Sequence, residues 1–460
     1  MNKIPSGTNI PEKLPLDIRK FPSDRGRSYG EINNILDTLA HRRSDGTMSK
    51  TQSIDIQVTE DCNLRCTYCF QINKSARKLK WEDAKAFIDY ILTRTPENCE
   101  YTNYDKYHAI TLGFVGGDPL VEIDLIDRIM TYFVERMIEL DHPWLTRFAV
   151  HLDTNGVAYF NSKVQMFLKK WGNAVSCTIT LDGNKDLHDK CRVFPDGTGS
   201  YKYAEAAIID QFKRGREPSG KFTISHENID YLYDAALNLI DLGYTYILGN
   251  EVYENVWTDD DPRRYYKQLK RLADTFLERG YYESIRFALL EMSKFYRMEQ
   301  ELYQNHCGGN GDMLDLSADG KMYPCYRYNR TAVGPNREPL SIGDPYNGIE
   351  STEKEKRLVA KLKTMTRLSC STIECIECPI KTACGYCNGC NYCSTGDPGI
   401  KVNFNCLMIC ASYIATYYYW SKVNIKKGIS ERYDFLLSKD KALKIISKEE
   451  YEELLRYKVM

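Results

Sequence analysis

The placement of the cysteines constrains this chain more than any other sequence feature. Of the 17 cysteines in 460 residues, 11 lie between Cys307 and Cys410. At roughly 100 to 200 residues per domain, the length allows two to four domains and a core large enough to be stable without disulfides. In a reducing compartment, cysteines spaced two or three residues apart indicate metal or redox chemistry. We therefore expect the chemistry of this protein to depend on cysteine ligands.

Charge and hydropathy argue against two classes of partner. Lys and Arg number 62 against 63 Asp and Glu, and no basic block occurs, so we expect no nucleic-acid partner. The N-terminus has no apolar run of signal-peptide length, which indicates a cytoplasmic protein. The most apolar stretch, Phe404–Trp420, is shorter than the roughly 20 residues of a membrane span. It predicts a packed helix, and we expect no membrane partner.

Strand-like and helix-like segments alternate from about residue 53 to residue 252. Amphipathic helix patterns, such as Trp81–Leu92 and Ile123–Leu140, lie between the strands and indicate a parallel sheet covered by helices. Six units are too few for a closed eight-stranded barrel, so an open partial barrel and a doubly wound sheet both fit. The expected strands are Ser53–Thr59, His108–Val115, Arg147–Leu152, Ala174–Leu181, Lys221–His226 and Thr245–Leu248.

Three cysteines follow the first expected strand at a Cys-x3-Cys-x2-Cys spacing: Cys62, Cys66 and Cys69. Three thiolates in one loop can hold a four-iron cluster with one iron left open. Zinc would require a fourth Cys or His nearby, and none lies between Cys69 and Cys99. Ordinary buried cysteines are the remaining alternative. The position at the carboxyl end of a strand, where βα folds build their sites, favours the cluster.

This loop, with Tyr68 before the third cysteine, resembles the signature of the radical S-adenosylmethionine (radical SAM) enzymes. The resemblance implies a partial (β/α)6 TIM-like barrel. It also implies a four-iron four-sulfur cluster whose open iron binds S-adenosylmethionine, and reductive cleavage of that cosubstrate to a 5′-deoxyadenosyl radical.

Several downstream segments match the same family. Gly116-Gly117-Asp118-Pro119 is similar to its Gly-Gly-Glu-Pro motif, although alone it is also a common turn sequence. His151–Gly156 and Thr178–Gly183 end in polar residues and Gly, as the mouth of a barrel strand does. For His188 and Cys191 we favour packing over catalysis. The cosubstrate-binding residues that the resemblance implies are Tyr68, Gly116, Gly117, Asp118, Asn155, Thr180, Asp182 and Arg192.

The C-terminal cysteines resemble the SPASM domain, which carries auxiliary iron-sulfur clusters. The resemblance implies three [4Fe-4S] clusters in all. One auxiliary cluster would use Cys375, Cys378, Cys384 and Cys406. The other would use Cys307, Cys325 and one of Cys387, Cys390 and Cys393, with Cys370 or Cys410 as a spare ligand. A zinc ribbon of Cys375, Cys378, Cys384 and Cys387 is the alternative.

We accordingly expect four regions. Residues 1–50 form an N-terminal extension, 51–300 the radical SAM barrel, 301–425 the SPASM domain and 426–460 a charged helical tail.

The resemblance favours a peptide maturase that crosslinks a ribosomally made precursor peptide, by a thioether foremost or by a carbon-carbon or carbon-oxygen bond. Sulfatase-maturating relatives place a basic Asp after the Cys325 equivalent, where this chain has Tyr326. Tyr, with a usual pKa of about 10, is a poor base at neutral pH. The alternatives are a sulfatase-type dehydrogenase that oxidises Cys or Ser, and a non-catalytic electron carrier. A radical enzyme also requires an electron donor such as flavodoxin or ferredoxin.

Overall fold

The computed structural model describes residues 51–93, 107–216, 220–295, 303, 307–334, 336–430 and 433–457. The N-terminal extension expected over residues 1–50 lies outside the described residues. The described strands form an eight-stranded sheet in the order β11-β10-β9-β8-β1-β2-β3-β4 and a three-stranded sheet in the order β5-β6-β7. Their bounds are β1 Thr51–Thr59, β2 Ala109–Gly116, β3 Phe148–Thr154, β4 Val175–Ile179, β5 Gly220–Ile224, β6 Tyr246–Glu251, β7 Arg286–Phe287, β8 Met313–Leu316, β9 Met322–Tyr323, β10 Gly343–Asp344 and β11 Gly348–Ile349.

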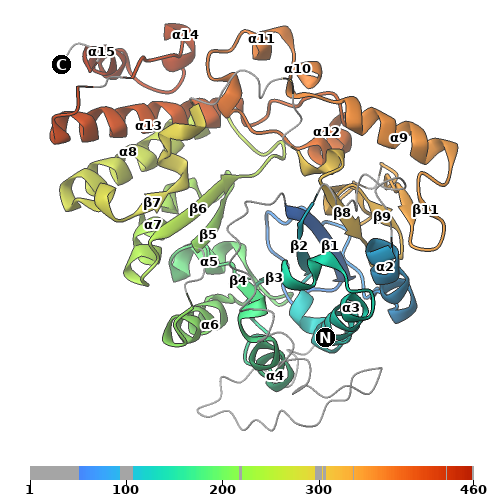
Figure 1. Cartoon of the computed structure of the whole chain (residues 1–460). Coiled ribbons are helices and arrows are strands. Elements are labelled where there is room, and N and C mark those ends of the chain that lie inside the picture. The colour runs from blue at the N-terminus through green and yellow to red at the C-terminus, as the bar shows by residue number, and fades with distance from the viewer. Residues whose placement is uncertain are drawn as a thin grey trace.

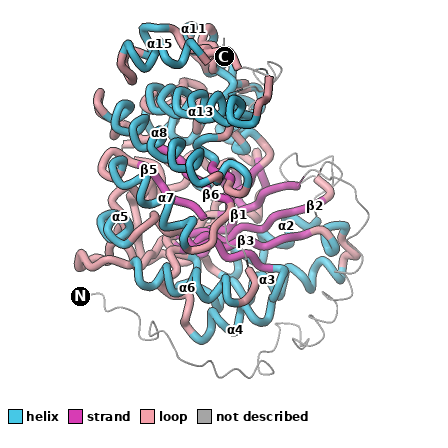
Figure 2. The backbone as a smooth tube through the Cα atoms, turned by 90° about the vertical axis from the view of Figure 1, so that its left-hand side faces the viewer, coloured by secondary structure: helices cyan, strands magenta, loops and turns pink. Residues whose placement is uncertain are grey.

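Helices cover the outer side of the parallel strands and extend above them (Figures 1 and 2). The α-helices are α2 Trp81–Thr93, α3 Ile123–Glu139, α4 Ser162–Trp171, α5 Lys185–Cys191, α6 Tyr201–Lys213, α7 Leu232–Asp241, α8 Asp261–Arg279, α9 Glu353–Thr364, α10 Arg367–Cys370, α11 Ile373–Ile376, α12 Asn388–Thr395, α13 Cys406–Lys427, α14 Lys439–Ala442 and α15 Lys448–Arg456.

The predicted α/β class and its six strands are confirmed. The strands correspond to β1 through β6, and α2 and α3 coincide with the two predicted helices to within one residue. In the described residues β4 and β5 are not hydrogen-bonded to each other, so the parallel strands fall into two sheets. The arrangement is open, and the partial barrel remains a prediction.

Strand β1 shows how the sequence positions the site. Its apolar residues Ile54, Ile56 and Val58 are fully buried in the main hydrophobic core. The alternate residues belong to the opposite face, because successive side chains in a strand point to opposite sides. That second face carries polar side chains, including Asp55 and Gln57, although it is also buried. The sheet therefore has an apolar side toward the helices and a polar side toward the interior of the open arrangement.

The C-terminal region is joined to the first sheet. Strand β8 pairs in parallel with β1 on the edge opposite β2, with Asp315 beside Asp55. The buried Gln57 side chain reinforces the junction, since it donates to Thr331 Oγ1 at 3.1 Å and accepts from Ser317 Oγ at 2.6 Å. The two regions expected on either side of residue 300 therefore share one sheet.

Helix α13 confirms the packed helix predicted for the apolar stretch. It lies along α8, where Tyr419 packs edge-on against Phe276 with ring centroids 6.3 Å apart. Its Tyr413 and Tyr417 are fully buried. None of the described helices is long and apolar enough to span a bilayer.

Two glycines with positive φ allow a direct test of backbone packing. Gly183 (φ +76°) lies so close to α7 that an added Cβ would be 2.3 Å from Ala235 Cα, whereas Gly197 (φ +86°) has no atom within 4 Å of that position. We expect Gly197→Ala to lose about 1 to 2 kcal/mol of unfolding free energy from the left-handed backbone alone. Gly183→Ala should lose a further ~1 to 3 kcal/mol from overpacking. Urea unfolding under anaerobic conditions measures both, and equal losses would contradict the close approach.

Candidate active site

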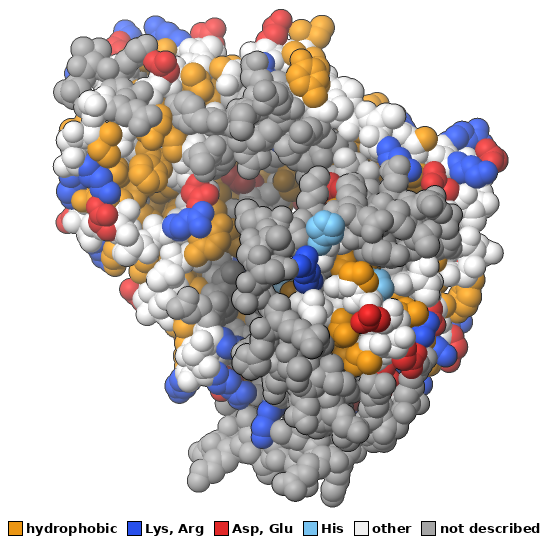
Figure 3. Space-filling view, viewed as in Figure 1, with side chains coloured by type: hydrophobic (Ala, Val, Ile, Leu, Met, Phe, Trp, Pro, Cys, Tyr) orange, Lys and Arg blue, Asp and Glu red, His pale blue; other side chains and the backbone are white. Residues whose placement is uncertain are grey.

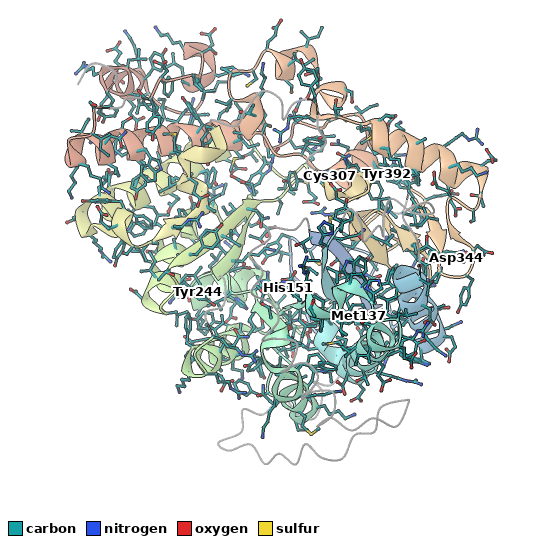
Figure 4. The ribbon with its side chains drawn as sticks, in the orientation of Figure 1. Met137, His151, Tyr244, Cys307, Asp344 and Tyr392 are labelled. Atoms are coloured by element: carbon teal, nitrogen blue, oxygen red, sulfur yellow. The ribbon has the colours of Figure 1, made fainter. Side chains whose placement is uncertain are left out.

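A cavity of about 520 Å³ brings the N-terminal and C-terminal cysteines together. Figure 4 shows Cys307 and His151 near the middle of the molecule, with Tyr244 and Asp344 toward opposite flanks. Among the residues predicted from the sequence, those that line the cavity are Cys62, Cys66, Tyr68, Cys69, Gly117, Asp118, Asn155, Thr180, Arg192, Cys307, Cys325 and Cys387. Gly116 and Asp182 are outside the lining. Segments far apart in the chain thus line one cavity.

The two glycines at the end of β2, Gly116 and Gly117, lie against the first cysteine loop. The Gly117 amide donates to Thr59 O at 3.0 Å, and the Asp118 amide donates to Asp61 O at 3.0 Å. A Cβ on Gly117 would lie 2.0 Å from Asp61 O, and one on Gly116 would lie 2.7 Å from Thr59 O. Side chains at these positions would therefore push the loop away from the sheet.

Asp118 acts mainly as a positioning residue for the neighbouring strand end. Its buried carboxylate accepts from Thr154 Oγ1 at 2.8 Å, from the Asn155 amide at 2.8 Å and from the Leu120 amide at 3.1 Å. Burial raises the pKa of Asp118 to about 6, although these hydrogen bonds act in the opposite direction. The loop after β2 and the loop after β3 are thereby tied together at the cavity wall.

Arg192 is oriented by Asp182. Its Nε donates to Asp182 Oδ2 at 2.7 Å, and the Tyr68 hydroxyl donates to the same oxygen. The Arg192 guanidinium also lies over the Tyr68 ring, 5.4 Å from its centroid. Asp182 is fully buried and does not line the cavity. Its hydrogen bonds therefore fix the positions of the Tyr68 and Arg192 side chains, which do line it.

His188 and Cys191 have packing roles, as the sequence favoured. His188 Nδ1 accepts from the Asp182 amide at 3.2 Å, and its Nε2 lies 3.0 Å from Ser200 Oγ. Burial lowers the pKa of His188 to about 4, so the ring is neutral at physiological pH. Cys191 is fully buried, and neither residue lines the cavity.

The first cysteine loop is suited to an iron-sulfur cluster. Its thiols share the cavity, Asn155 Nδ2 lies 3.6 Å from Cys62 Sγ, and Lys74 Nζ lies 3.0 Å from Cys69 Sγ. Such donors stabilise thiolate ligands and tune a cluster. Burial raises the pKa of Cys62 to about 12, so bound iron would have to ionise this thiol.

The C-terminal cysteines separate into two groups. Cys307, Cys325 and Cys387, here called the inner cysteine set, line the cavity. Burial raises the pKa of the Cys307 thiol, and the nearby Cys387 and Cys370 add to the shift. Cys370 is therefore the spare cysteine that the structure places near this set.

The other group is called the outer cysteine set: Cys375, Cys378, Cys384 and Cys406. All four are partly exposed. Burial raises the pKa of the Cys384 thiol, and the nearby Cys406 and Cys375 add to the shift. The thiols of Cys406 and Cys410 also interact with each other. In the described part of the chain, no three Cys, His, Asp or Glu side chains are arranged to hold a single metal ion.

Cys390 and Cys393 belong to neither set. They line a second cavity of about 670 Å³ beside the first. Arg327 and Glu254 line both cavities and form an ion pair at 2.5 Å. This pair therefore lies in the wall between the two spaces.

An acid-base cluster on the polar face of the sheet was missed by the sequence analysis. Asp55, Gly113 and His151 are register partners on β1, β2 and β3. A Cβ on Gly113 would lie 2.1 Å from Asp55 Oδ1, so the glycine leaves room for that carboxylate over β2. His151 Nε2 lies 3.1 Å from Asp153 Oδ1, and Asp153 lines the cavity.

Neighbouring groups in this cluster shift the pKa values of Asp55 and His151. Burial and the nearby Asp153 raise the pKa of Asp55 to about 7. The hydrogen bond to Asp153 raises the pKa of His151. Histidine side chains are visible near the centre of the face drawn in Figure 3. Alternating polar residues in β1 and β3 were the available signal, but their convergence depends on strand register.

Comparison with known proteins gives relatives over parts of the chain. An uncharacterized protein of Methanocaldococcus jannaschii is 36% identical over 189 residues, 41% of this chain and 58% of that protein. A cysteine-type anaerobic sulfatase-maturating enzyme of Clostridium perfringens is 24% identical over 376 residues, 75% of this chain and 90% of that enzyme. The radical SAM cyclopropyl synthase TigE of Paramaledivibacter caminithermalis is 22% identical over 231 residues, 46% of this chain and 45% of that enzyme. The chain thus spans less than two thirds of the first and third relatives.

Solved structures share the fold. Native anSMEcpe with bound AdoMet matches with a TM-score of 0.58 at 17% identity. The match covers 82% of this chain and 100% of that one. SuiB of Streptococcus suis bound to S-adenosylmethionine matches with a TM-score of 0.51 at 14% identity, over 83% of this chain and 82% of that one. No protein-family model matches the chain. The predicted resemblance is nevertheless confirmed: this protein is a homologue of radical SAM enzymes that include the anaerobic sulfatase-maturating enzymes and a cyclopropyl synthase.

Proposed function

We propose that this protein is a radical SAM peptide maturase that installs a crosslink in a ribosomally made precursor peptide. The bond would foremost be a thioether, with carbon-carbon and carbon-oxygen bonds as alternatives. One observation carries the proposal: the first cysteine loop and the inner cysteine set line the same cavity. A radical formed at the loop and an oxidant held by the inner set would act on one substrate.

The proposed cofactor sites use the three groups of cysteines. Cys62, Cys66 and Cys69 would hold the first [4Fe-4S] cluster, and the inner and outer cysteine sets would hold two more. When bound there, the first cluster and S-adenosylmethionine would supply the 5′-deoxyadenosyl radical. Gly117, Thr180 and Arg192 line the cavity and would contact the cosubstrate, and Asp182 would keep the Arg192 guanidinium in position for a carboxylate. The SPASM assignment belongs to this proposal.

Proton removal can be assigned to the acid-base cluster. Crosslinking by net loss of two hydrogens releases one hydrogen atom, one proton and one electron. Tyr326 occupies the position of the base in sulfatase-maturating relatives. Asp153 lines the same cavity, where His151 is hydrogen-bonded to it and the Asp55 carboxylate is close enough to interact with its charge. The hydrogen bond with His151 lowers the pKa of Asp153 against the effect of burial, and the same bond raises the pKa of His151. Asp153 would therefore receive the proton and pass it to His151, 3.1 Å away.

A sulfatase-type dehydrogenase that oxidises Cys or Ser is the second candidate. The relative from Clostridium perfringens carries that name and matches 75% of the chain. The argument against this candidate was that Tyr326 is a poor base. That argument is weaker in the structure, because Asp153 of β3 provides a carboxylate in the same cavity. A non-catalytic electron carrier is disfavoured, since it would not need the residues built around the cosubstrate space. In either enzyme we propose flavodoxin or ferredoxin as the electron donor, in the cytoplasm.

The experiment that tests the function uses anaerobically reconstituted protein, S-adenosylmethionine and dithionite. The peptides are the product of any short Cys-rich reading frame beside the gene and the Cp18Cys peptide bound in an anSMEcpe structure. We expect 5′-deoxyadenosine and a two-hydrogen mass loss with the first peptide, together with loss of one alkylatable thiol. Complete alkylation after that mass loss would contradict a thioether. Oxidation of only Cp18Cys would favour the dehydrogenase.

The cluster assignment predicts about twelve irons per chain, at about four per cluster. Cys62→Ala, Cys66→Ala and Cys69→Ala together should remove only about four, because the other two sets come from the C-terminal region. Iron analysis of the anaerobically purified full chain measures this. Loss of most iron in the triple variant, or zinc in the C-terminal region, would contradict the assignment.

The acid-base cluster predicts a pH-dependent stability. The Asp55 pKa rises from its ordinary 3.8 to about 7 on folding, so the unfolded state loses its proton first as pH rises. Stability should fall between pH 5 and pH 8, by up to about 3 kcal/mol from this group. The pKa of His151 is also raised in the folded state, so the stability that its protonated form contributes is lost as pH rises through that pKa. Both groups therefore lower the stability as pH rises.

Asp55→Asn should lose less stability over that range than the parent. Anaerobic urea unfolding at pH 5 and pH 8 measures the difference. Asp124→Asn, which removes an exposed carboxylate paired with Lys163, is the control and should follow the parent. Parallel behaviour of the parent and Asp55→Asn would show that Asp55 ionises normally.

A further inference from the structure

Two lysines contact the sulfurs of the outer cysteine set. Lys401 Nζ lies 3.3 Å from Cys384 Sγ and 4.0 Å from Cys375 Sγ. Lys441, from α14 in the C-terminal tail, has its Nζ 3.8 Å from Cys378 Sγ. Two ammonium groups from different segments therefore reach three of the four sulfurs.

The surroundings of Lys401 and Lys441 indicate that their ammonium groups have a negatively charged partner. Lys401 is only 8% exposed. In the described part of the chain, neither Lys401 nor Lys441 forms an ion pair with a carboxylate. A buried ammonium without an anion is costly, so the partner that would compensate it is an ionised sulfur. The outer set is thus arranged for ligands that a bound metal ionises.

The inner cysteine set is arranged differently. Its neighbouring cation is Arg327, whose charge acts on Cys387. Arg327 is paired with Glu254 at 2.5 Å, so much of its field is cancelled. No lysine contact to Cys307, Cys325 or Cys387 is present among the described residues. The surroundings of the outer set are therefore more positive than those of the inner set.

Local charge has a direct effect on redox chemistry. Reduction adds one negative charge to a cluster, and nearby cations and hydrogen bonds to its sulfurs favour the reduced form. A cluster held by the outer set should consequently have a higher reduction potential than one held by the inner set.

We propose that Lys401 and Lys441 raise the reduction potential of a cluster held by the outer cysteine set above that of a cluster held by the inner set. This inference rests on the proposed function and its clusters. The two lysines transfer neither electrons nor protons, so the balance of the proposed reaction is unchanged.

The test is an anaerobic potentiometric titration of the reconstituted full chain, monitored by electron paramagnetic resonance. Cys62→Ala, Cys66→Ala and Cys69→Ala form the background, so only the C-terminal clusters contribute. We expect Lys401→Met and Lys441→Met each to shift the higher of the two midpoint potentials to a more negative value, with iron content unchanged. The lower potential should stay in place.

Two control variants separate charge from packing. Lys401→Arg keeps the positive charge and should retain most of the parent potential. Lys439→Met removes an exposed charge from the same short helix as Lys441 and should have little effect, because water screens it. Equal shifts in Lys439→Met and Lys441→Met would overturn the inference, as would unchanged potentials in both sulfur-contacting variants. A parent without iron in the C-terminal region would instead refute the proposed clusters, and the proposed role of the two lysines with them.

Discussion

The pairing of β8 with β1 is the interaction on which the rest of the site depends. Strand β1 leads into the first cysteine loop, and β8 and β9 lead to Cys325, so one parallel ladder brings the two cysteine regions together. The buried Gln57 secures that junction through Ser317 and Thr331. Glu60, just beyond the strand, pairs with Arg330. A site shared by distant parts of the chain is thereby held by a continuous sheet rather than by flexible loops.

The two faces of this sheet have opposite chemistry. The apolar face packs under α2 and α3 and provides the hydrophobic stabilisation. The polar face presents ionisable groups to the cavity. Buried carboxylates such as Asp55 and Asp315 have raised pKa values, mainly because burial disfavours their charged forms. Stability is therefore lowered on the face where reactive groups are required, and the apolar face compensates for it.

Sequence patterns predicted the local parts of this arrangement. Alternation located the six parallel strands, spacing located the first cysteine loop, and hydrophobicity located α13. They did not predict the pairing of β8 with β1, because contacts between distant strands leave no periodic signal. The meeting of Asp55 and His151 across Gly113 depends on register for the same reason. Likewise, the contact of Lys441 with Cys378 joins a tail helix to a loop, and the charged tail alone suggested only a solvated surface.

The ion pair between Arg327 and Glu254 has a consequence for substrate selectivity. It lies in the wall between the two neighbouring cavities of about 520 and 670 Å³. Under the proposed function, a peptide that enters both cavities would have to separate or bridge the two side chains. A substrate residue with its own charge replaces the lost contact, whereas an apolar residue leaves a charge partly unpaired. In the proposed enzyme, the wall would thus discriminate between peptides at a position removed from the reacting atoms.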